Sequence, residues 1–276
     1  MQVNMHSGGQ RVVITGAGSG LGRELALRYA KAGARLALAD VQEKGLAETQ
    51  IMVEAAGAAA FVQRCDVRDF SQLAALAQTC IERMDGIDVL INNAGVSSGG
   101  YFWDLSLEDW EWQISVNLMG VVKGCKAFIP HMLGQGAGRI INIASMAALM
   151  QAPGMSNYNV AKAGVVALSE SLLAELTPLG IKVHVVCPSF FQTNLLDSFR
   201  GPDQASKEQI AKLLENSPIS AADVAEIIFS RSQAGDFMIL PHERGAQAWE
   251  LKKANPQVIY DEMVHLAGKQ LGQSSI

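Results

Sequence analysis

Tyr158 and Lys162 lie four residues apart in the stretch SNYNVAKAG, residues 156 to 164. On a helix, residues at this spacing share one face, so the pair could present a phenol and an ammonium group to the same point. Free tyrosine, with a pKa near 10, is a poor base at neutral pH, but a nearby positive charge favours tyrosinate. The pair could therefore serve as an acid/base. The spacing alone does not decide this, because such pairs also occur by chance on helices that only pack.

A glycine-rich turn supplies a second candidate site. TGAGSGLG, residues 15 to 22, follows an apolar run and opens an amphipathic one. Gly16, Gly20 and Gly22 permit a tight turn and a close approach of a pyrophosphate to backbone N–H groups, where the helix dipole favours an anion. We expect Ser19 and Leu21 of the same turn to contact the cofactor as well. Glycine is also used in such turns for steric reasons alone, so the turn by itself is weak evidence.

Asp40 ends the next apolar run, eighteen residues past Gly22. An acidic side chain there accepts hydrogen bonds from the ribose hydroxyls of the adenosine and repels a 2′-phosphate. No Arg or Lys immediately follows Asp40, and Ser19 rather than a basic residue precedes Gly20. The pattern therefore favours NAD(H) over NADP(H). The alternative is that Asp40 is only a solvated carboxylate at the end of a strand.

Two further motifs end later apolar runs. Asp66 and Val67 are expected at the carboxyl edge of the sheet, where they could flank an adenine. The motif NNAG, residues 92 to 95, places Asn93, Ala94 and Gly95 at the same edge, close to the expected reversal of the strand order.

The elements that must position these residues form a regular series. Short apolar runs alternate with longer amphipathic runs such as residues 20–33, 43–57 and 70–84. The short runs are apolar on both faces, which is typical of a parallel sheet covered by helices on both sides. The series predicts a doubly wound α/β sheet in one domain. Its seven strands are expected within residues 11–15, 35–40, 59–66, 87–95, 138–145, 181–189 and 236–241.

Three segments fall outside this rhythm. Residues 1–10 are expected to be a disordered tail, and residues 11–276 one catalytic domain. Residues 190–220 mix aromatic residues with Gly, Pro and Asn, which indicates a substrate lid rather than a helix packed on the sheet. Residues 243–276 are expected to form a C-terminal helical extension of two short helices, separated near Asn255 and Pro256.

Composition excludes several classes of protein. The chain has 276 residues, of which 49% are apolar and 18% charged, and its net charge is −5. A basic surface for nucleic acid is not indicated, and no apolar run approaches the roughly 18 residues that span a bilayer. The four cysteines are far apart, with no C-x-x-C pair or neighbouring histidine. We therefore expect no metal site and no disulfide, and a location in the reducing cytoplasm.

Taken together, these motifs resemble the short-chain dehydrogenase/reductase family. The resemblance rests on TGAGSGLG, Asp66, NNAG, Asn117 in ISVNLMG, Ser145 in NIAS, YNVAK at 158–162 and CPSFFQT at 187–193. It implies a Rossmann-type sheet of strand order 3-2-1-4-5-6-7 and a catalytic set of Asn117, Ser145, Tyr158 and Lys162. Tyr158 would exchange a proton with the substrate oxygen, Ser145 would hold that oxygen, and Asn117 would anchor a water that connects Lys162 to solvent.

The resemblance also implies further contacts with the cofactor, and the chain departs from the family in two places. Lys162 would bind the nicotinamide ribose, while Pro188 and Thr193 would hold the carboxamide. Ser189 replaces the glycine usual after Pro188, and the glycine-containing C-terminal motif that packs in the family's tetramer is absent. We therefore expect a homodimer, built on the helices after strands four and five, with the tetramer usual for the family as the alternative.

Apolar residues near these motifs suggest a substrate class. Met146, Phe190, Phe191 and Leu195 are expected to line the substrate pocket, and Tyr101, Phe102 and Trp103 could add to it. The sequence therefore predicts an oxidoreductase that acts on a hydrophobic secondary alcohol or ketone. Two alternatives remain: an NADPH-dependent 3-ketoacyl reductase, and a sensor that binds dinucleotide without turnover.

Overall fold

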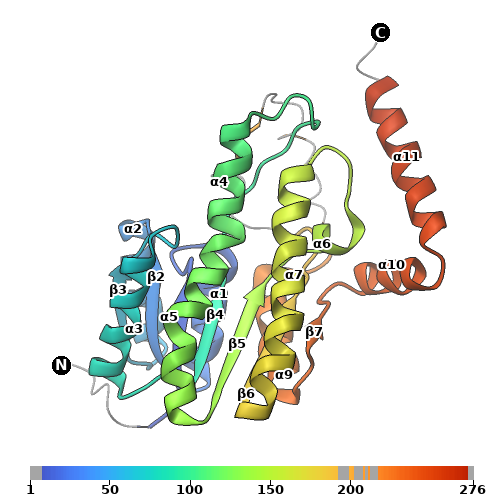
Figure 1. Cartoon of the computed structure of the whole chain (residues 1–276). Helices are drawn as coiled ribbons and strands as arrows, with labels where there is room; N and C mark the ends of the chain where they lie inside the picture. The colour runs from blue at the N-terminus through green and yellow to red at the C-terminus, as the bar shows by residue number, and fades with distance from the viewer. Residues whose placement is uncertain (1–7, 192–198, 202–207, 209–210, 212–216, 273–276) are drawn as a thin grey trace.

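Seven parallel strands form one sheet in the order β3-β2-β1-β4-β5-β6-β7 (Figure 1). The computed structural model describes residues 8–191, 199–201, 208, 211 and 217–272. Most of the expected tail and most of the expected lid lie outside these residues. The strands are β1 (Arg11–Thr15), β2 (Arg35–Asp40), β3 (Ala60–Arg64), β4 (Val89–Asn92), β5 (Gly138–Ile143), β6 (Ile181–Val186) and β7 (Met238–Ile239). The fold class and strand order predicted from the sequence are confirmed.

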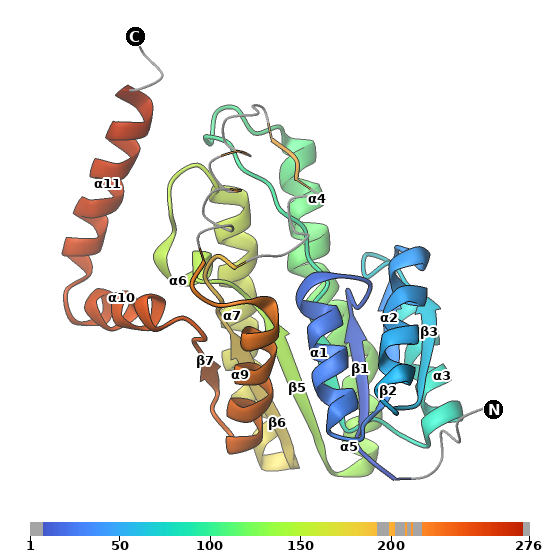
Figure 2. The same cartoon turned by 180° about the vertical axis from the view of Figure 1, so that it is seen from behind.

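Helices cover both faces of the sheet. The front face carries α3 (Phe70–Met84), α4 (Leu107–Asn117), α5 (Met119–Gln135) and α7 (Ser156–Leu176), as Figure 1 shows. The opposite face carries α1 (Gly20–Lys31), α2 (Glu43–Ala55) and α9 (Ala221–Ala234), seen from behind in Figure 2. A short helix, α6 (Ala147–Met150), follows β5, and a 3₁₀ turn (Thr177–Leu179) follows α7.

The strands are apolar on both faces because each face belongs to a different core. Val13 of β1 packs in the cluster beneath α3, α5 and α7, together with Leu76, Phe128 and Val165. Its neighbours Val12 and Ile14 point the other way, into the cluster beneath α1, α2 and α9. Side chains of a strand alternate between faces, so only a strand covered on both sides needs consecutive apolar residues.

All carboxyl ends of the strands open at one edge of the sheet. The parallel register pairs Thr15 with Ala39 and Asp40 with Arg64. On the other side of β1, Asn92 pairs with Asn142, and Ile143 pairs with Val186. The loops that follow these residues therefore meet at that edge, as the motifs required.

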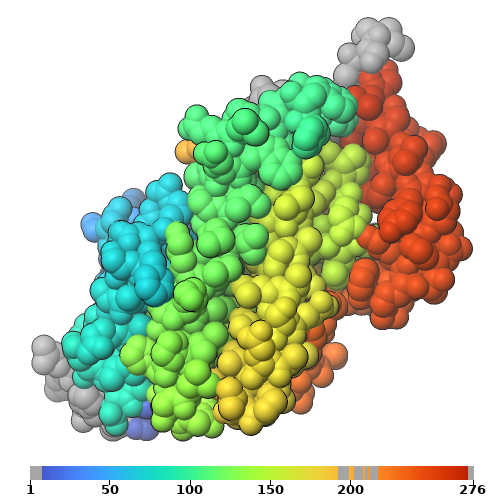
Figure 3. All heavy atoms as spheres, viewed as in Figure 1, coloured from blue at the N-terminus to red at the C-terminus, as the bar shows by residue number. Residues whose placement is uncertain are grey.

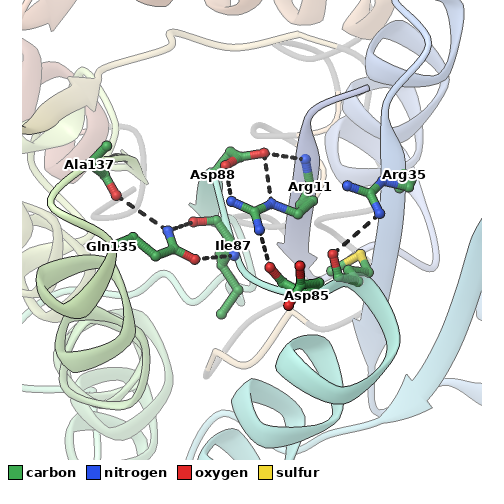
Figure 4. Close-up of polar contacts among 8 residues, drawn as sticks. Arg11, Arg35, Asp85, Ile87, Asp88, Gln135 and Ala137 are labelled. Carbon is green, nitrogen blue, oxygen red and sulfur yellow. Dashed lines mark hydrogen bonds and ion pairs between the residues drawn. The ribbon is translucent and has the colours of Figure 1, made fainter. Parts of the chain in front are cut away.

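The opposite edge is closed by side chains that bind the backbone (Figure 4). The backbone N–H of Arg11 donates to Asp88 at 2.8 Å, and its guanidinium also contacts Asp88 and the carbonyl oxygen of Asp85. The amide of Gln135, at the end of α5, donates to the carbonyl oxygen of Ile87 and accepts from its N–H. These bonds hold the starts of β1 and β4 in place, and so help to position the loops at the carboxyl ends of the same strands.

The C-terminal extension consists of α10 (Glu243–Ala254) and α11 (Pro256–Gly272). It packs along one flank of the molecule, beside α6 (Figures 1 and 3). Gly245 permits this close packing, because a Cβ there would lie 3.2 Å from the side chain of Met146. The Lys252 ammonium donates to the carbonyl oxygen of Leu149 at the end of α6. The extension is therefore attached to the segment that directly follows Ser145.

Candidate active site

A cavity of about 710 Å³ lies at the carboxyl edge of the sheet. Its wall contains parts of every motif singled out from the sequence: the glycine turn, Asp40, Asp66, NNAG, Ser145, the Tyr158–Lys162 pair and Pro188. The strands that carry these residues are far apart in the sequence but converge at this edge.

Tyr158 and Lys162 lie in the first two turns of α7, and both side chains are buried. The Lys162 ammonium donates to the carbonyl oxygen of Ile143 at 2.9 Å and lies 5.8 Å from the centre of the Tyr158 ring. The start of α7 is held by Asn157, whose amide donates to the Ser98 hydroxyl at 2.7 Å. The first turn of α7 is therefore held in place, and the helix presents the Tyr158 phenol and the Lys162 ammonium to the cavity.

Ser145 meets this pair from the end of β5. Its hydroxyl accepts a hydrogen bond from the N–H of Ala147 at 3.1 Å, and its interaction with the Tyr158 phenol lowers the pKa of that phenol. The bond from the backbone orients the hydroxyl of Ser145 without using its proton. Ser145, Tyr158 and Lys162 thus converge on one corner of the cavity.

Burial controls the ionisation of this corner. Loss of hydration raises the pKa of Tyr158 to about 12, an effect partly offset by the hydrogen bond with Ser145. Loss of hydration also lowers the pKa of Lys162 to about 8. Both shifts follow from the cost of placing a charge away from water. Tyr158 is therefore a neutral phenol at neutral pH unless positive charge is brought close to it.

Asn117 is the last residue of α4, where the long helical segment after β4 breaks into α4 and α5. Its amide nitrogen donates to the carbonyl oxygen of Val96 at 2.9 Å, and its amide oxygen accepts from the N–H of Val96 at 2.9 Å. A Cβ on Gly95 would lie 3.0 Å from that amide oxygen and 3.6 Å from the Lys162 nitrogen. Asn117 therefore fixes the loop beside Lys162, and the proposed water relay stays a prediction.

The glycine turn packs directly against NNAG. Gly16 has a φ of +67°, and a Cβ there would lie 2.7 Å from the Cα of Ala94. The Asn93 amide donates to the carbonyl oxygens of Thr15 and Gly16, both at 3.0 Å. The amide nitrogen of Asn93 therefore stabilises the glycine turn. The N-cap of α1, Ser19, makes no side-chain cap bond with the first N–H groups of the helix, and the first residues of α1 line the cavity.

Asp40 and Asp66 lie in the part of the cavity beyond the glycine turn. The Asp40 carboxylate accepts from the N–H of Gly18 at 2.9 Å and of Gln42 at 3.0 Å, which fixes its orientation. Asp66 pairs with Arg68, and that hydrogen bond holds the pKa of Asp66 below its usual range. Val67 and Arg68 line the cavity beside it. None of the sequence motifs predicted a basic side chain here.

Pro188 and Ser189, which follow β6, also line the cavity. The carbonyl oxygen of Pro188 accepts from the N–H of Met146 at 2.8 Å, and the N–H of Ser189 donates to Nδ1 of His242 at 3.1 Å. The serine that replaces the expected glycine thus donates its backbone N–H to His242, the residue directly before α10. Thr193, the other residue expected at the carboxamide, lies outside the described residues.

The expected substrate pocket is only partly as predicted. Met146, Phe190 and Phe191 line the cavity, and Leu195 lies outside the described residues. Tyr101, Phe102 and Trp103 do not line it. Phe102 and Trp103 are each 68% exposed. Their rings contact other aromatic rings instead of the cavity: Tyr101 stacks on Trp103, and Phe102 packs against Trp110. The expectation that these three residues form part of the pocket was wrong.

Several lining residues were not found from the sequence. They include Trp112 on α4, Met155 before α7, and four residues of the C-terminal extension, namely Arg244, Gly245, Ala248 and Met263. Met155 carried a signal, since it directly precedes the helix that holds Tyr158. The residues of the extension carried none, because their role depends on where α10 and α11 pack.

The described residues contain no group of three or more His, Cys, Asp and Glu side chains that could hold a metal ion. No helix in the same residues is long and apolar enough to cross a membrane. All four cysteines are free and buried, and burial raises the pKa of the thiol of Cys65 to about 11.

The sheet order and the layers of helices define a fold of the Rossmann type. A family model described as short chain dehydrogenase matches residues 10–204. The chain therefore belongs to the short-chain dehydrogenase family.

Individual relatives agree with this assignment. The probable oxidoreductase EphD of Mycobacterium tuberculosis is 36% identical over 186 residues, which are 67% of this chain but only 31% of that protein. The 2-(R)-hydroxypropyl-CoM dehydrogenase of Xanthobacter autotrophicus is 34% identical over 220 residues, covering 78% of this chain and 88% of that protein. Among solved structures, a short chain dehydrogenase/reductase from Burkholderia phymatum in complex with NAD has a TM-score of 0.86 and 36% identity, covering 93% of this chain and 96% of that one.

Proposed function

We propose that the protein is an NAD(H)-dependent oxidoreductase that interconverts a secondary alcohol and a ketone on a hydrophobic substrate. The observation that carries this proposal is the convergence of Ser145, Tyr158 and Lys162 at one corner of a cavity that also contains the glycine turn. The dehydrogenase name of the Xanthobacter relative, which refers to a hydroxypropyl compound, supports the same class of reaction.

The residues of the glycine turn fit a dinucleotide. A Cβ on Gly22 would lie 2.0 Å from the carbonyl oxygen of Gly16, so the chain needs glycine to keep this turn tight below the open end of α1. A pyrophosphate would be held by the N–H groups of the turn and of the first residues of α1, including Gly20 and Leu21. A bound nicotinamide ring would supply the hydride acceptor or donor.

Tyr158, Ser145 and Lys162 would manage the proton and the charge on the substrate oxygen. In ketone reduction the Tyr158 phenol donates its proton to that oxygen, and in alcohol oxidation the tyrosinate removes it. The Ser145 hydroxyl stabilises the oxygen as negative charge develops. Lys162, in its protonated form, stabilises tyrosinate. Asn117 keeps the loop at Val96 in place beside Lys162.

Asp40 favours NAD(H) over NADP(H). Backbone N–H groups from Gly18 and Gln42 hold its carboxylate toward the cavity, where a ribose would offer two hydroxyl donors. A 2′-phosphate would meet the same negative charge. The NAD complex of the Burkholderia relative supports this preference. The remaining contacts proposed for the cofactor come from Ser19, Asp66, Val67, Ala94, Gly95, Pro188 and Thr193.

The two alternatives make different predictions. An NADPH-dependent 3-ketoacyl reductase would prefer a carrier-bound acyl group and NADPH, which Asp40 opposes. A sensor would bind dinucleotide without turnover, and such a protein has no physical need for Ser145, Tyr158 and Lys162 to converge. We further propose that the protein acts as a homodimer in the cytoplasm.

A substrate screen that follows NADH absorbance, run with both cofactors, tests the proposal. The expected result is turnover of bulky apolar secondary alcohols or ketones with NAD(H). Comparable turnover of a small charged hydroxy acid would contradict the proposed substrate class. Cofactor binding without hydride transfer across a wide panel would favour the sensor.

A further inference from the structure

Among the residues that the structure describes, five charged ones line the cavity, and four of them belong to functions already described. Asp40, Asp66 and Arg68 follow β2 and β3 in the nucleotide half, and Lys162 belongs to the catalytic corner. The fifth is Arg244, in the first turn of α10.

Arg244 lies on the substrate side of the cavity. The chain reaches α10 from β7, the edge strand at the opposite end of the sheet from β3. The next residue, Gly245, packs against Met146, which directly follows Ser145. Arg244 is therefore close to the catalytic corner and remote from the strands that carry the adenosine contacts.

The guanidinium of Arg244 has no hydrogen bond or ion pair within the described part of the chain, and the side chain is exposed. The two lysines of the same helix are engaged: Lys252 binds Leu149 and Gln151, and Lys253 pairs with Glu250 at 2.8 Å. Among the described lining residues, those of α6, α10 and α11 include the apolar Met150, Ala248 and Met263, and Met146 lies against Gly245. A single unpaired cation at the rim of an apolar wall matches a ligand with an apolar body and one anionic end.

We propose that Arg244 binds the carboxylate of the substrate, so that the protein acts on apolar oxo or hydroxy acids. The carbonyl or hydroxyl group lies at Ser145 and Tyr158, the apolar body follows the methionines, and the carboxylate lies at the rim. A guanidinium can bind a carboxylate through two parallel N–H donors, which gives direction as well as charge. This inference rests on the proposed function, whose substrate class it narrows.

Calorimetric binding to the protein saturated with NADH provides a test that needs no turnover. The probes are decanoate and decanamide, which share an apolar chain and differ in charge. Wild-type protein should bind decanoate more tightly. Arg244→Met should weaken decanoate binding by roughly five- to thirtyfold, as expected for a charge-assisted bond that is partly screened by solvent, and leave decanamide unchanged.

Lys253→Met is the matched control, because it removes a positive charge from the same helix outside the cavity lining. It should leave the affinity for decanoate unchanged. The inference would be overturned if Arg244→Met weakened the binding of both probes equally or of neither. It would also be overturned if Lys253→Met weakened decanoate binding as much as Arg244→Met does, or if wild-type protein did not bind decanoate. An equal loss of NADH affinity in Arg244→Met would assign Arg244 to the nucleotide instead.

Kinetics with oxo acids of increasing length and with their methyl esters test the role of Arg244 separately from the proposed oxidoreductase function. Wild-type protein should have a higher kcat/KM for the acids, and Arg244→Met should remove that advantage while leaving the esters unaffected. Turnover of the esters with no preference for the acids would overturn the role of Arg244 alone. If neither series were turned over, the proposed function would fail, and the binding measurements would still decide whether Arg244 holds a carboxylate.

Discussion

At the scale of single residues, burial keeps the catalytic corner in a definite state of protonation. Tyr158, with a pKa raised to about 12, holds its proton at neutral pH and is ready to act as an acid on a ketone. Lys162, with a pKa lowered to about 8, is an ammonium held out of water by the packing around α7. Activity thus depends on a charge whose burial the rest of the fold must stabilise.

This burial of Lys162 predicts a pH-dependent stability. Below about pH 8 the folded protein contains a buried ammonium, and the cost of burying it is present in full. As pH rises above that value Lys162 becomes neutral in the fold, and the cost disappears as pH passes the pKa of lysine in the unfolded chain. Wild-type protein should therefore gain about 2 kcal/mol in free energy of unfolding relative to Lys162→Met between neutral pH and about pH 9.5.

Urea unfolding of both proteins without cofactor, at several pH values, checks this expectation. Lys252→Met serves as a control on a lysine that is much less buried, and it should show a smaller change. A constant difference between wild type and Lys162→Met would mean that the Lys162 ammonium is not desolvated.

Asp40 predicts the choice of cofactor. Asp40→Asn keeps an oxygen that can accept from the N–H of Gly18 but removes the charge that opposes a 2′-phosphate. The ratio of kcat/KM for NAD to that for NADP should fall by roughly tenfold or more, mainly through a gain for NADP. Glu48→Gln, which removes a carboxylate that pairs with Arg23 outside the cavity lining, should leave the ratio unchanged. An unchanged ratio in Asp40→Asn would assign cofactor choice to another residue.

At the scale of elements, the C-terminal extension holds the two loops that flank the catalytic corner. His242 accepts from Ser189, Gly245 packs on Met146, and Lys252 binds the end of α6. The loops after β5 and β6 are joined to each other through Met146 and Pro188. The extension thus directly supports the loops that carry the site.

The bond between His242 and Ser189 predicts a defect in cofactor binding rather than in chemistry. His242→Phe removes the acceptor and leaves the N–H of Ser189 without its partner, which should raise KM for NADH roughly five- to tenfold with little change in kcat. His242→Asn should restore KM, because its side-chain oxygen occupies nearly the position of Nδ1. A fall in kcat with unchanged KM, or no rescue by Asn, would show that His242 does not act through Ser189.

The sequence predicted the elements and motifs that local pattern and parallel topology determine. The seven strands follow from consecutive apolar residues, and Asp40, NNAG, Ser145 and Tyr158 share an edge because parallel strands end together. It could not reveal that the Asn93 amide serves the glycine turn, or that Asp66 pairs with Arg68, because both depend on side-chain packing. It placed Tyr101, Phe102 and Trp103 in the pocket because proximity in sequence does not show which way a loop turns. Arg244 was missed since only the packing of α10 brings it to the cavity.

At the scale of the whole molecule, the homodimer stays a prediction. Apolar side chains on the outer faces of α5 and α7 are left exposed, among them Leu133 at 42% and Val160 at 50%. Burying such residues against a second copy would stabilise a dimer built on these helices. Sedimentation equilibrium should give a dimer, and Leu133→Asp should weaken association at least tenfold. A monomer at micromolar concentration, or a dimer insensitive to Leu133, would contradict this interface.

The central claim, that Tyr158 gives the proton while a nicotinamide gives the hydride, can be tested in one measurement. Wild-type protein and Tyr158→Phe are each incubated with an apolar ketone and NADH that carries deuterium at both C4 positions, and the alcohol is analysed by mass spectrometry. We predict deuterium at the carbinol carbon with wild-type protein and a loss of at least about a hundredfold with Tyr158→Phe, although the variant still binds NADH. Retention of more than a few per cent of the wild-type rate by Tyr158→Phe, or no deuterated alcohol with wild-type protein, would contradict the account.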